Sequence, residues 1–241
     1  MRAGVLIIGS LLWDEGPERD VWRQTRLRIE NAVHVRAPIR YGRLSQSRGN
    51  TFTMVFSSSG QLGQAVLAPC IREVSSIAAL VSEAKKLWRA EQPNAPRESI
   101  GAPWGCVGVL FDPHIDRVDC VKAWADYFHR NKVSPIHPVD RDGMLRIPWP
   151  APSTDNRTDN IDIILATATR AETEHPSPEE IASAWIKQEM GYERYFFENI
   201  QHGIRTPDDL LVWKKIENAC PSWLSKPEYA ETAVALRGES R

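Results

Sequence analysis

The first seventy residues alternate between apolar runs and polar turns in a way that predicts several strands. Residues 5–8 (VLII) form a β-branched run typical of a buried strand, which stops abruptly at a glycine. Residues 26–36 alternate like a half-buried strand, and residues 51–57 and 64–68 predict two strands joined by Ser-Ser-Gly. Residues 40–50 (RYGRLSQSRGN) are polar, basic and turn-rich, which predicts a loop.

A helix and a buried strand are predicted next. Either Ser75 or Ser76 can cap the helix, which is expected to end before Pro93 because proline cannot continue the ladder of N–H donors. Residues 104–111 (WGCVGVLF) have the continuous apolar pattern of a central strand. The apolar face of the helix consists of Ile77, Leu80, Val81, Ala84, Leu87 and Trp88.

The stretch from residue 112 to 159 mixes several patterns. Residues 119–130 (DCVKAWADYFHR) predict an amphipathic helix, and residues 144–153 (MLRIPWPAPS) an extended piece broken by prolines. Residues 153–160 read as a polar linker or exposed loop, and residues 160–168 (NIDIILATA) as a further strand.

The tail is predicted to be helical. Ser177 is placed to cap a helix that has Pro178 at its first position and Glu180 at its third. A second helix is expected over about residues 192–201, and a third begins after Thr206.

Strands concentrated first and helices concentrated last indicate an α+β fold. We expect one domain over residues 1–241, with a small mixed or antiparallel, barrel-like sheet, helices packed around it and a helical tail over residues 177–241.

The charge balance argues against electrostatically driven partners. Thirty basic and thirty-one acidic residues leave a net charge of −1, so we expect neither nucleic acid nor an anionic membrane as a partner. No stretch approaches the roughly 18 apolar residues of a membrane span. A low net charge permits self-association, and the sequence leaves monomer and homodimer both open.

The cysteines indicate a reducing compartment. Cys70, Cys106, Cys120 and Cys220 form no C-x-x-C pair, which disfavours a zinc site, a redox motif or a disulfide framework. Arg2 and the apolar run resemble the start of a signal peptide, but no A-x-A-like cleavage site follows. We therefore expect reduced thiols in a cytoplasmic protein.

The glycine that ends the first strand opens the stretch Gly9-Ser10-Leu11-Leu12-Trp13. A dinucleotide-binding turn needs G-x-G-x-x-G, and here large apolar residues occupy the places of the later glycines. No phosphate loop, hydrolase elbow or zinc-binding helix motif occurs, and the six histidines are scattered. Ser10 would need a base to act as a nucleophile, and none is evident in the sequence.

Several motifs, in order, resemble the γ-glutamylcyclotransferase family. That family begins with a strand followed by Y-G-S-L or Y-G-S-N, and this chain has Ile8-Gly9-Ser10-Leu11. Its catalytic glutamate ends an L-x-x-R-E-like segment, which Leu87-Trp88-Arg89-Ala90-Glu91 matches in Leu and Glu. The tail resembles the family's last strand, its P-x-x-E-I helix and its G-x-x-x-Y-(L/F) helix. The ChaC-like, glutathione-degrading branch is the most similar.

The chain also departs from that pattern. Ile8 replaces the tyrosine of the first motif, and the ChaC-like R-G-T-P-E segment is reduced to Arg48-Gly49-Asn50-Thr51. Residues 113–159 read as an insertion, which we expect to be peripheral and to cover one end of the pocket. If so, a chain without this segment should still fold.

The resemblance implies an enzyme that cyclises a γ-glutamyl amide to 5-oxoproline and releases an amine, with no cofactor and no metal. Glu91 would be the catalytic carboxylate, with Glu98 in reserve. Ile8, Gly9, Ser10, Leu11 and Arg48 would bind the substrate, with loop N–H groups toward its carboxylate or the developing oxyanion. Residues 9–12 are expected to form one wall of the pocket.

Other assignments remain open. Arg40 and Arg43 can meet a substrate carboxylate or be solvated, Tyr192 and Tyr195 can line the pocket or belong to the core, and Trp13, Trp88 and Trp104 are expected to pack beside the site. The alternatives to a cyclotransferase are a non-catalytic member of the fold that binds small molecules, and a related amide-processing enzyme of a biosynthetic pathway.

Overall fold

The computed structural model describes residues 1–115, 118–153, 161–173, 175–187 and 193–239. Its strands are β1 (Ala3–Ile7), β2 (Val33–Ala37), β3 (Ile39–Ser45), β4 (Thr51–Phe56), β5 (Gly63–Pro69), β6 (Gly101–Ala102), β7 (Gly105–Phe111) and β8 (Ile163–Thr169). Its α-helices are α1 (Pro17–Arg26), α2 (Ile77–Glu91), α3 (Val118–Arg130), α4 (Pro178–Ile186), α5 (Arg194–Gln201), α6 (Asp209–Ala219) and α7 (Ala230–Glu239).

The fold is α+β, and most of its strand pairs are antiparallel. Six strands form one sheet in the order β2-β5-β1-β8-β7-β6, in which only the β1–β8 pair is parallel, and β3 and β4 form a separate two-stranded sheet. The expectation of α+β is confirmed. The expectation of a barrel-like sheet is wrong, because the strands of the described residues form an open sheet and a hairpin.

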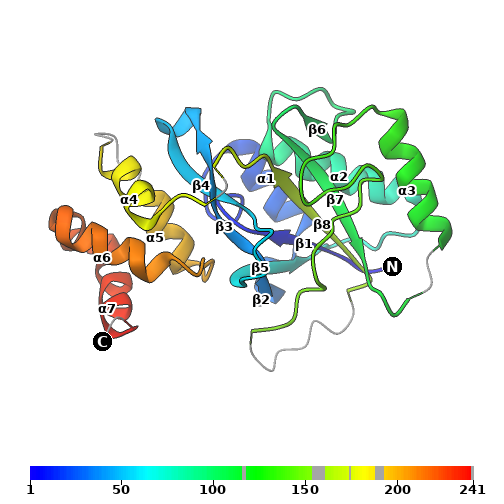
Figure 1. The fold of residues 1–241 in the computed structure, drawn as a ribbon. Coiled ribbons are helices and arrows are strands. Elements are labelled where there is room, and N and C mark those ends of the chain that lie inside the picture. Colours follow the sequence, from blue (N-terminus) through cyan, green and yellow to red (C-terminus); the bar gives the residue numbers. More distant parts are fainter. Residues whose placement is uncertain (116–117, 154–160, 174, 188–192, 240–241) are drawn as a thin grey trace.

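The helices form two groups. Helix α2 packs against α1 and against β7 and β8 of the six-stranded sheet, whereas α4 contacts β4 and α6. Figure 1 shows α4, α5, α6 and α7 gathered at one end of the molecule, beside the β3–β4 hairpin, and α3 at the opposite end. The hairpin therefore lies between the main sheet and the C-terminal helices.

Local sequence signals account for several of the helix boundaries. The Ser76 hydroxyl accepts a hydrogen bond from the Ala79 N–H, and α2 ends two residues before Pro93, as predicted. Ser177 and Glu180 form the reciprocal capping box that opens α4. Gly203 follows α5 with a φ of 72°, a conformation that glycine adopts without strain.

The two-stranded sheet is where the strand prediction fails. Residues 40–50 were expected to be a loop, yet residues 39–45 form β3, which pairs with β4 along its length. Tyr41 is buried, and the buried Arg40 donates hydrogen bonds to the carbonyls of Tyr41 and Thr173, at 2.9 Å each. Pairing with β4 and hydrogen bonds to distant carbonyls stabilise these polar residues in a strand, although their intrinsic propensity favours a loop.

One further expectation is wrong in detail. Of the predicted strand over residues 26–36, only the end is a strand, β2, because the residues before it end α1 and form the 3₁₀ turn Ile29–Asn31. The two strands expected over residues 51–57 and 64–68 both form, as β4 and β5, on either side of the Ser-Ser-Gly turn. They belong to different sheets, since β5 pairs with β1 and β2.

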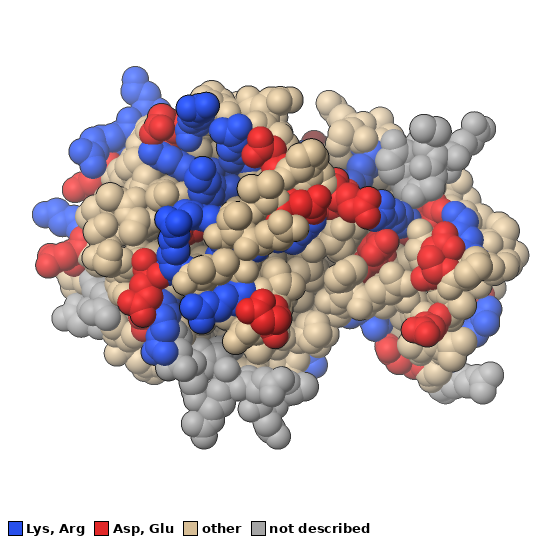
Figure 2. Space-filling model, turned by 180° about the vertical axis from the view of Figure 1, so that it is seen from behind, with Lys and Arg blue, Asp and Glu red and all other residues tan. Residues whose placement is uncertain are grey.

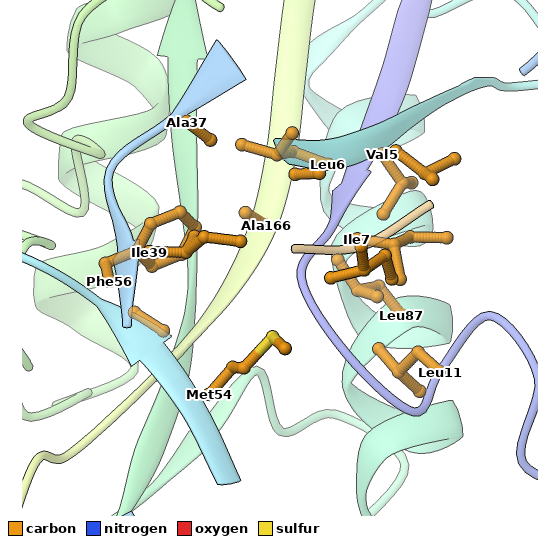
Figure 3. Close-up of a cluster of buried hydrophobic side chains, with 14 of the residues drawn as sticks. Val5, Leu6, Ile7, Leu11, Ala37, Ile39, Met54, Phe56, Leu87 and Ala166 are labelled. Atoms are coloured by element: carbon orange, nitrogen blue, oxygen red, sulfur yellow. The ribbon is translucent and has the colours of Figure 1, made fainter. Parts of the chain in front are cut away.

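One cluster of buried side chains extends from Ala3 in β1 to Leu236 in α7. Figure 3 shows its central part, in which Ile7 and Leu11 lie beside Leu87 of α2, and Met54 extends from the hairpin toward the same region. Burial of such aliphatic side chains contributes roughly 1.5–3 kcal/mol each. The core thus fixes the end of β1 against α2.

The described residues of the segment 113–159 are not peripheral. Helix α3 buries Trp124 and Phe128 completely, and the Trp124 indole N–H donates to the Gly143 carbonyl at 3.0 Å. Met144 and Leu145 then lie along Val109 of β7. Residues 116–117 and 154–159 of this segment lie outside the described residues. The described part covers the sheet and contributes to its core.

No helix in the part of the chain that the structure describes is both long enough and apolar enough to cross a membrane. On the face seen in Figure 2, acidic and basic side chains are interspersed. This distribution agrees with the balanced charge of the sequence.

Because α3 and the chain after it bury large side chains, replacing residues 118–147 with a short Gly-Ser linker is expected to abolish cooperative thermal unfolding, measured by circular dichroism. Within the intact chain, Phe128→Ala is expected to lower the free energy of unfolding by about 3–5 kcal/mol. Val118→Ala is the control, because the Val118 side chain is 71% exposed, and its effect should stay within about 0.5 kcal/mol. A truncated chain that unfolds cooperatively at the original temperature would contradict this assignment.

Candidate functional site

The loop after β1 forms a tight turn. The Gly9 carbonyl accepts a hydrogen bond from the Leu12 N–H at 3.2 Å. The Ser10 carbonyl accepts hydrogen bonds from the N–H groups of Trp13 and Asp14, at 3.2 and 2.8 Å. The N–H groups of Gly9, Ser10 and Leu11 have no hydrogen-bond acceptor among the described residues. Three successive amides therefore have no partner in the described part of the fold, and consecutive backbone N–H groups can donate to a carboxylate or an oxyanion.

Two buried apolar side chains hold this loop. Leu11 and Trp13 are both buried, and the Trp13 indole N–H donates to the Asn199 side-chain carbonyl of α5 at 2.8 Å. Leu11 packs in the cluster that contains Leu87. These two side chains therefore anchor the loop to the core.

A small cavity lies beside the turn. Its volume is about 50 Å³, several times the roughly 10–15 Å³ that a single water needs. Its wall combines the end of β1, the hairpin, β8, the end of α2 and one residue of α5. The lining residues are Leu6, Ile7, Ile8, Gly9, Ser10, Leu11, Arg43, Arg48, Thr53, Met54, Glu91, Thr167, Thr169 and Tyr195. We call it the inner cavity.

A larger, more open cavity of about 360 Å³ adjoins the inner one. Three residues line both: Arg43, Arg48 and Glu91. We call this second space the outer cavity. Its other lining residues are Arg19, Leu44, Ser45, Gln46, Ser47, Gln92, Trp104 and Glu172. The shared residues mark a boundary at which a ligand can extend from the small space into the large one.

Glu91 reaches this boundary because it is the last residue of α2. The helix buries Leu87 and Trp88 against the sheet, and its final turn is closed by the Gln92 N–H, which donates to the Trp88 carbonyl at 2.8 Å. This packing fixes the direction of the helix end. The Glu91 side chain is only partly buried and lines both cavities.

Arg48 is held in place by the turn. It ends the 3₁₀ turn Gln46–Arg48, and its guanidinium donates to the Ser10 hydroxyl at 3.0 Å and to the Asp14 carboxylate at 2.9 Å. Asp14 also pairs with Arg19. Because Asp14 accepts from both arginines, it links the β1–α1 loop to the hairpin and fixes Arg48 at the cavity wall.

Arg43 has a different environment. Its guanidinium lies 4.3 Å from the centroid of the Trp104 ring, a cation–π contact. Burial lowers the pKa of Arg43, while the negative charges of Glu91 and Glu172 act in the opposite direction. Stacking on the indole keeps the cation at the boundary without consuming its hydrogen-bond donors.

Tyr195 of α5 closes the inner cavity. Its hydroxyl oxygen accepts a hydrogen bond from the Met54 N–H at 3.0 Å, and the ring makes an edge contact with Trp13. Burial raises the pKa of Tyr195, and the Met54 N–H and the Arg48 charge oppose that shift. The phenol therefore stays protonated at neutral pH.

Three threonines line the inner cavity as well. Thr53 lies on β4, whereas Thr167 and Thr169 lie two residues apart on β8 and so share one face of that strand. The Thr53 hydroxyl donates to the Arg43 carbonyl at 3.3 Å, and the Thr167 hydroxyl has no partner among the described residues. The cavity thus combines hydroxyls, two guanidinium groups and one carboxylate.

The structure brings the sequence-predicted site residues to one place. Ile8, Gly9, Ser10, Leu11, Arg48 and Glu91 all line the inner cavity. Their roles in binding and catalysis stay predictions. Leu12 was expected in the same wall but does not line this cavity.

Other candidates lie elsewhere. The Glu98 side chain is 79% exposed and pairs with Lys85, outside both cavities. Arg40 is buried against backbone carbonyls, and Trp88 lies in the core, whereas Trp104 lines the outer cavity. Tyr192 lies outside the described residues.

The expectation that residues 113–159 cover one end of the pocket is wrong for the described residues of that segment. None of them lines the inner or the outer cavity. Met144 and Leu145 lie along β7, whereas residues 151–153 lie along β2, at the other edge of the six-stranded sheet.

Sequence reasoning did not single out Thr53, Thr167 or Thr169. Threonine is common in strands, so a threonine within an apolar strand gives little warning of a cavity. The one available signal is the alternation in residues 166–169 (ATAT), which places two hydroxyls on one face of β8.

Among the described residues, no base is hydrogen-bonded to the Ser10 hydroxyl and no cluster of side chains is placed to hold a metal ion. The partner of the Ser10 hydroxyl is an arginine, which is a donor and cannot act as a base. No described histidine or cysteine lines either cavity, and no described group of three His, Cys, Asp or Glu residues is placed to hold a metal ion. Glu91 is the only described lining residue of the inner cavity that can accept a proton as a carboxylate.

Comparisons with protein-family models, with curated proteins and with solved structures found no match.

The contact between Gly9 and Tyr195 can be tested directly. A Cβ on Gly9 would lie 2.9 Å from the Tyr195 hydroxyl, so Gly9→Ala is expected to lower the free energy of unfolding by about 1–3 kcal/mol, measured by urea denaturation. In a Tyr195→Phe background the hydroxyl is absent, and the cost should fall. Gly16→Ala is the control, since nothing lies within 4 Å of its added Cβ. Equal costs in both backgrounds would show that this contact does not constrain the loop.

Proposed function

We propose that this protein is a cofactor-free γ-glutamylcyclotransferase-like enzyme, which cyclises a γ-glutamyl amide to 5-oxoproline and releases an amine. The observation that carries the proposal is the meeting, at one cavity, of the Glu91 carboxylate with the unpaired N–H groups of Gly9, Ser10 and Leu11. A proton acceptor and an oxyanion site at a single small cavity are what such a ring closure requires.

The reaction is intramolecular. The α-amine of the substrate attacks its own γ-carbonyl carbon, a C–N bond forms, and the original amide C–N bond breaks. No water, oxidant or reductant is consumed. Ring closure of this kind benefits from effective molarities of about 10⁵–10⁸ M when the reacting groups are held in register. The protein therefore has to hold a folded conformer and to manage one proton and one developing charge.

In this proposal Glu91 moves the proton. As the new bond forms, its carboxylate accepts a proton from the α-amine, and it then returns that proton to the nitrogen of the leaving amine. The negative charge that develops on the γ-carbonyl oxygen is stabilised by the loop N–H groups, whose positions are fixed by the turn before the reaction starts.

The two cavities are suited to two different parts of the substrate. The inner cavity, at about 50 Å³, accommodates a compact group that closes into a ring, and the outer cavity, at about 360 Å³, accommodates the amine that leaves. Glu91 lines both, so the scissile bond lies at their boundary in this proposal.

Replacing the base tests the proposal. Glu91→Gln keeps the shape of the side chain and removes the proton acceptor, so the turnover number for 5-oxoproline release from a panel of γ-glutamyl amides is expected to fall by roughly 100-fold or more. Substrate binding, measured by calorimetry, should persist.

Glu98→Gln is the matched control, because Glu98 lies outside both cavities, and its activity should be unchanged. Full activity of Glu91→Gln would exclude Glu91 as the base. If the unmutated protein binds γ-glutamyl amides but turns none over, it is a non-catalytic binding protein. If it cleaves other amides instead, the related amide-processing alternative takes the place of the cyclotransferase.

A further inference from the structure

The last turn of α2, which carries Glu91, is attached to α1 by Arg19. The Arg19 Nε–H donates a hydrogen bond to the Ala90 carbonyl at 3.2 Å. The last carbonyls of a helix have no partner within the helix, and a cation near them also complements the helix dipole. Arg19 therefore holds the backbone of the residue directly before Glu91.

The same guanidinium reaches the loop after β1. Its Nη1 pairs with the Asp14 carboxylate, and that carboxylate also accepts a hydrogen bond from Arg48 at 2.9 Å. Arg48 in turn donates to the Ser10 hydroxyl at 3.0 Å. A continuous series of hydrogen bonds thus runs from the loop, through both arginines, to the end of α2. We call the two contacts of Arg19, with Asp14 and with the Ala90 carbonyl, the Arg19 link.

The surroundings of the Arg19 link favour it over an ordinary surface ion pair. The side chains of Arg19 and Asp14 are 17% and 26% exposed, so water screens their charges only in part. A guanidinium is planar and can meet two acceptors at once in a fixed geometry. The pair of Arg89 with Glu18 also joins α2 to α1, but its side chains are 36% and 45% exposed, and neither lines the inner or the outer cavity. This second pair provides a comparison within the same helix contact.

The position of Glu91 depends on the backbone at the end of α2. No hydrogen bond or ion pair with another described residue holds the Glu91 carboxylate. The loop, in contrast, has a further support, because Arg23 donates to the carbonyls of Leu11 and Asp14, at 2.8 and 3.1 Å. Loss of the Arg19 link would therefore release the helix end more than the loop.

We propose that Arg19 is a positioning residue, whose link fixes the distance between the Glu91 carboxylate and the N–H groups of the loop. This role rests on the proposed function, in which that carboxylate and those N–H groups act on one substrate. A displacement of about 1 Å can cost roughly 100-fold in rate, so a partly released helix end reduces turnover. The link itself is a feature of the fold and can be measured without substrate.

The first test is kinetic. Arg19→Met removes the guanidinium and keeps the aliphatic part of the side chain. Because the groups proposed to bind the substrate stay in place, the variant is expected to lower kcat for 5-oxoproline release about tenfold or more, with KM changed less than about twofold. Arg19→Lys keeps a cation that can reach one of the two acceptors, and it should recover part of the lost kcat. Arg89→Met is the matched control, and its kcat and KM should be unchanged.

The second test needs no activity. Hydrogen–deuterium exchange of the full-length protein without ligand is measured by mass spectrometry. Arg19→Met is expected to speed the exchange of amides at residues 88–92 about two- to tenfold, because the last turn of α2 loses a hydrogen bond that holds it closed. Arg89→Met should change this exchange less than about twofold. If Arg19→Met does not fold, Asp14→Asn provides the same exchange comparison, and it should also raise KM because Arg48 loses the same partner.

The outcomes separate this inference from the reaction. Unchanged exchange at residues 88–92 would overturn the Arg19 link, whether or not the protein is an enzyme. A raised KM with unchanged kcat in Arg19→Met would overturn the positioning role and indicate direct contact with the leaving amine, since Arg19 also lines the outer cavity. Faster exchange in a protein that turns over no γ-glutamyl amide would support the link and overturn its role in the reaction, together with the proposed function.

Discussion

The position of the Tyr195 hydroxyl connects three parts of the chain that are far apart in sequence. The hydroxyl oxygen accepts a hydrogen bond from the Met54 N–H of the hairpin and lies against Gly9, just after β1. The Tyr195 ring packs on Trp13. A Cβ on Gly9 would lie 2.9 Å from this hydroxyl, so either the loop or the tyrosine would have to shift to admit one. The inner cavity exists because β1, the hairpin and α5 meet at this point.

The C-terminal helices are attached to the hairpin by a buried polar network. The Asp209 carboxylate of α6 accepts hydrogen bonds from the Thr206 hydroxyl at 2.7 Å and from the Tyr41 hydroxyl of β3 at 3.0 Å. Arg205 lies 3.3 Å from the same carboxylate. Burial raises the pKa of Asp209, and these partners oppose the shift. A buried carboxylate with several partners fixes one arrangement of helix and hairpin, because any other leaves it unpaired.

This attachment matters for the site. Helices α4 to α6 hold the strand that carries Thr53 and Met54, and α5 supplies Tyr195. On the opposite side, α2 carries Glu91, held by the burial of Leu87 and Trp88 against the main sheet. The chemistry proposed for the boundary between the two cavities therefore requires two layers to pack together: the hairpin with the C-terminal helices, and the main sheet with α2. Arg43 and Arg48, from the hairpin, face the carboxylate from α2 only when the two layers are packed together.

The sequence by itself determined the local elements with strong signals. The caps at Ser76 and Ser177, the end of α2 before proline and the apolar strands β1, β4, β5, β7 and β8 follow from side-chain chemistry within a few residues. It also singled out the residues of the turn and Glu91, through the order of motifs along the chain. The structure places them around one cavity.

Only the tertiary structure decided what depends on contacts between distant residues. Polar residues 40–45 form a strand because β4 pairs with them and because backbone carbonyls and Asp209 satisfy Arg40 and Tyr41. The segment after β7 belongs to the core because Trp124 and Phe128 find a surface to cover. Thr167 faces a cavity because β8 lies beside β1. Hydrogen bonding and burial between such distant partners leave no periodic signal in the sequence, since the partners are supplied by the fold.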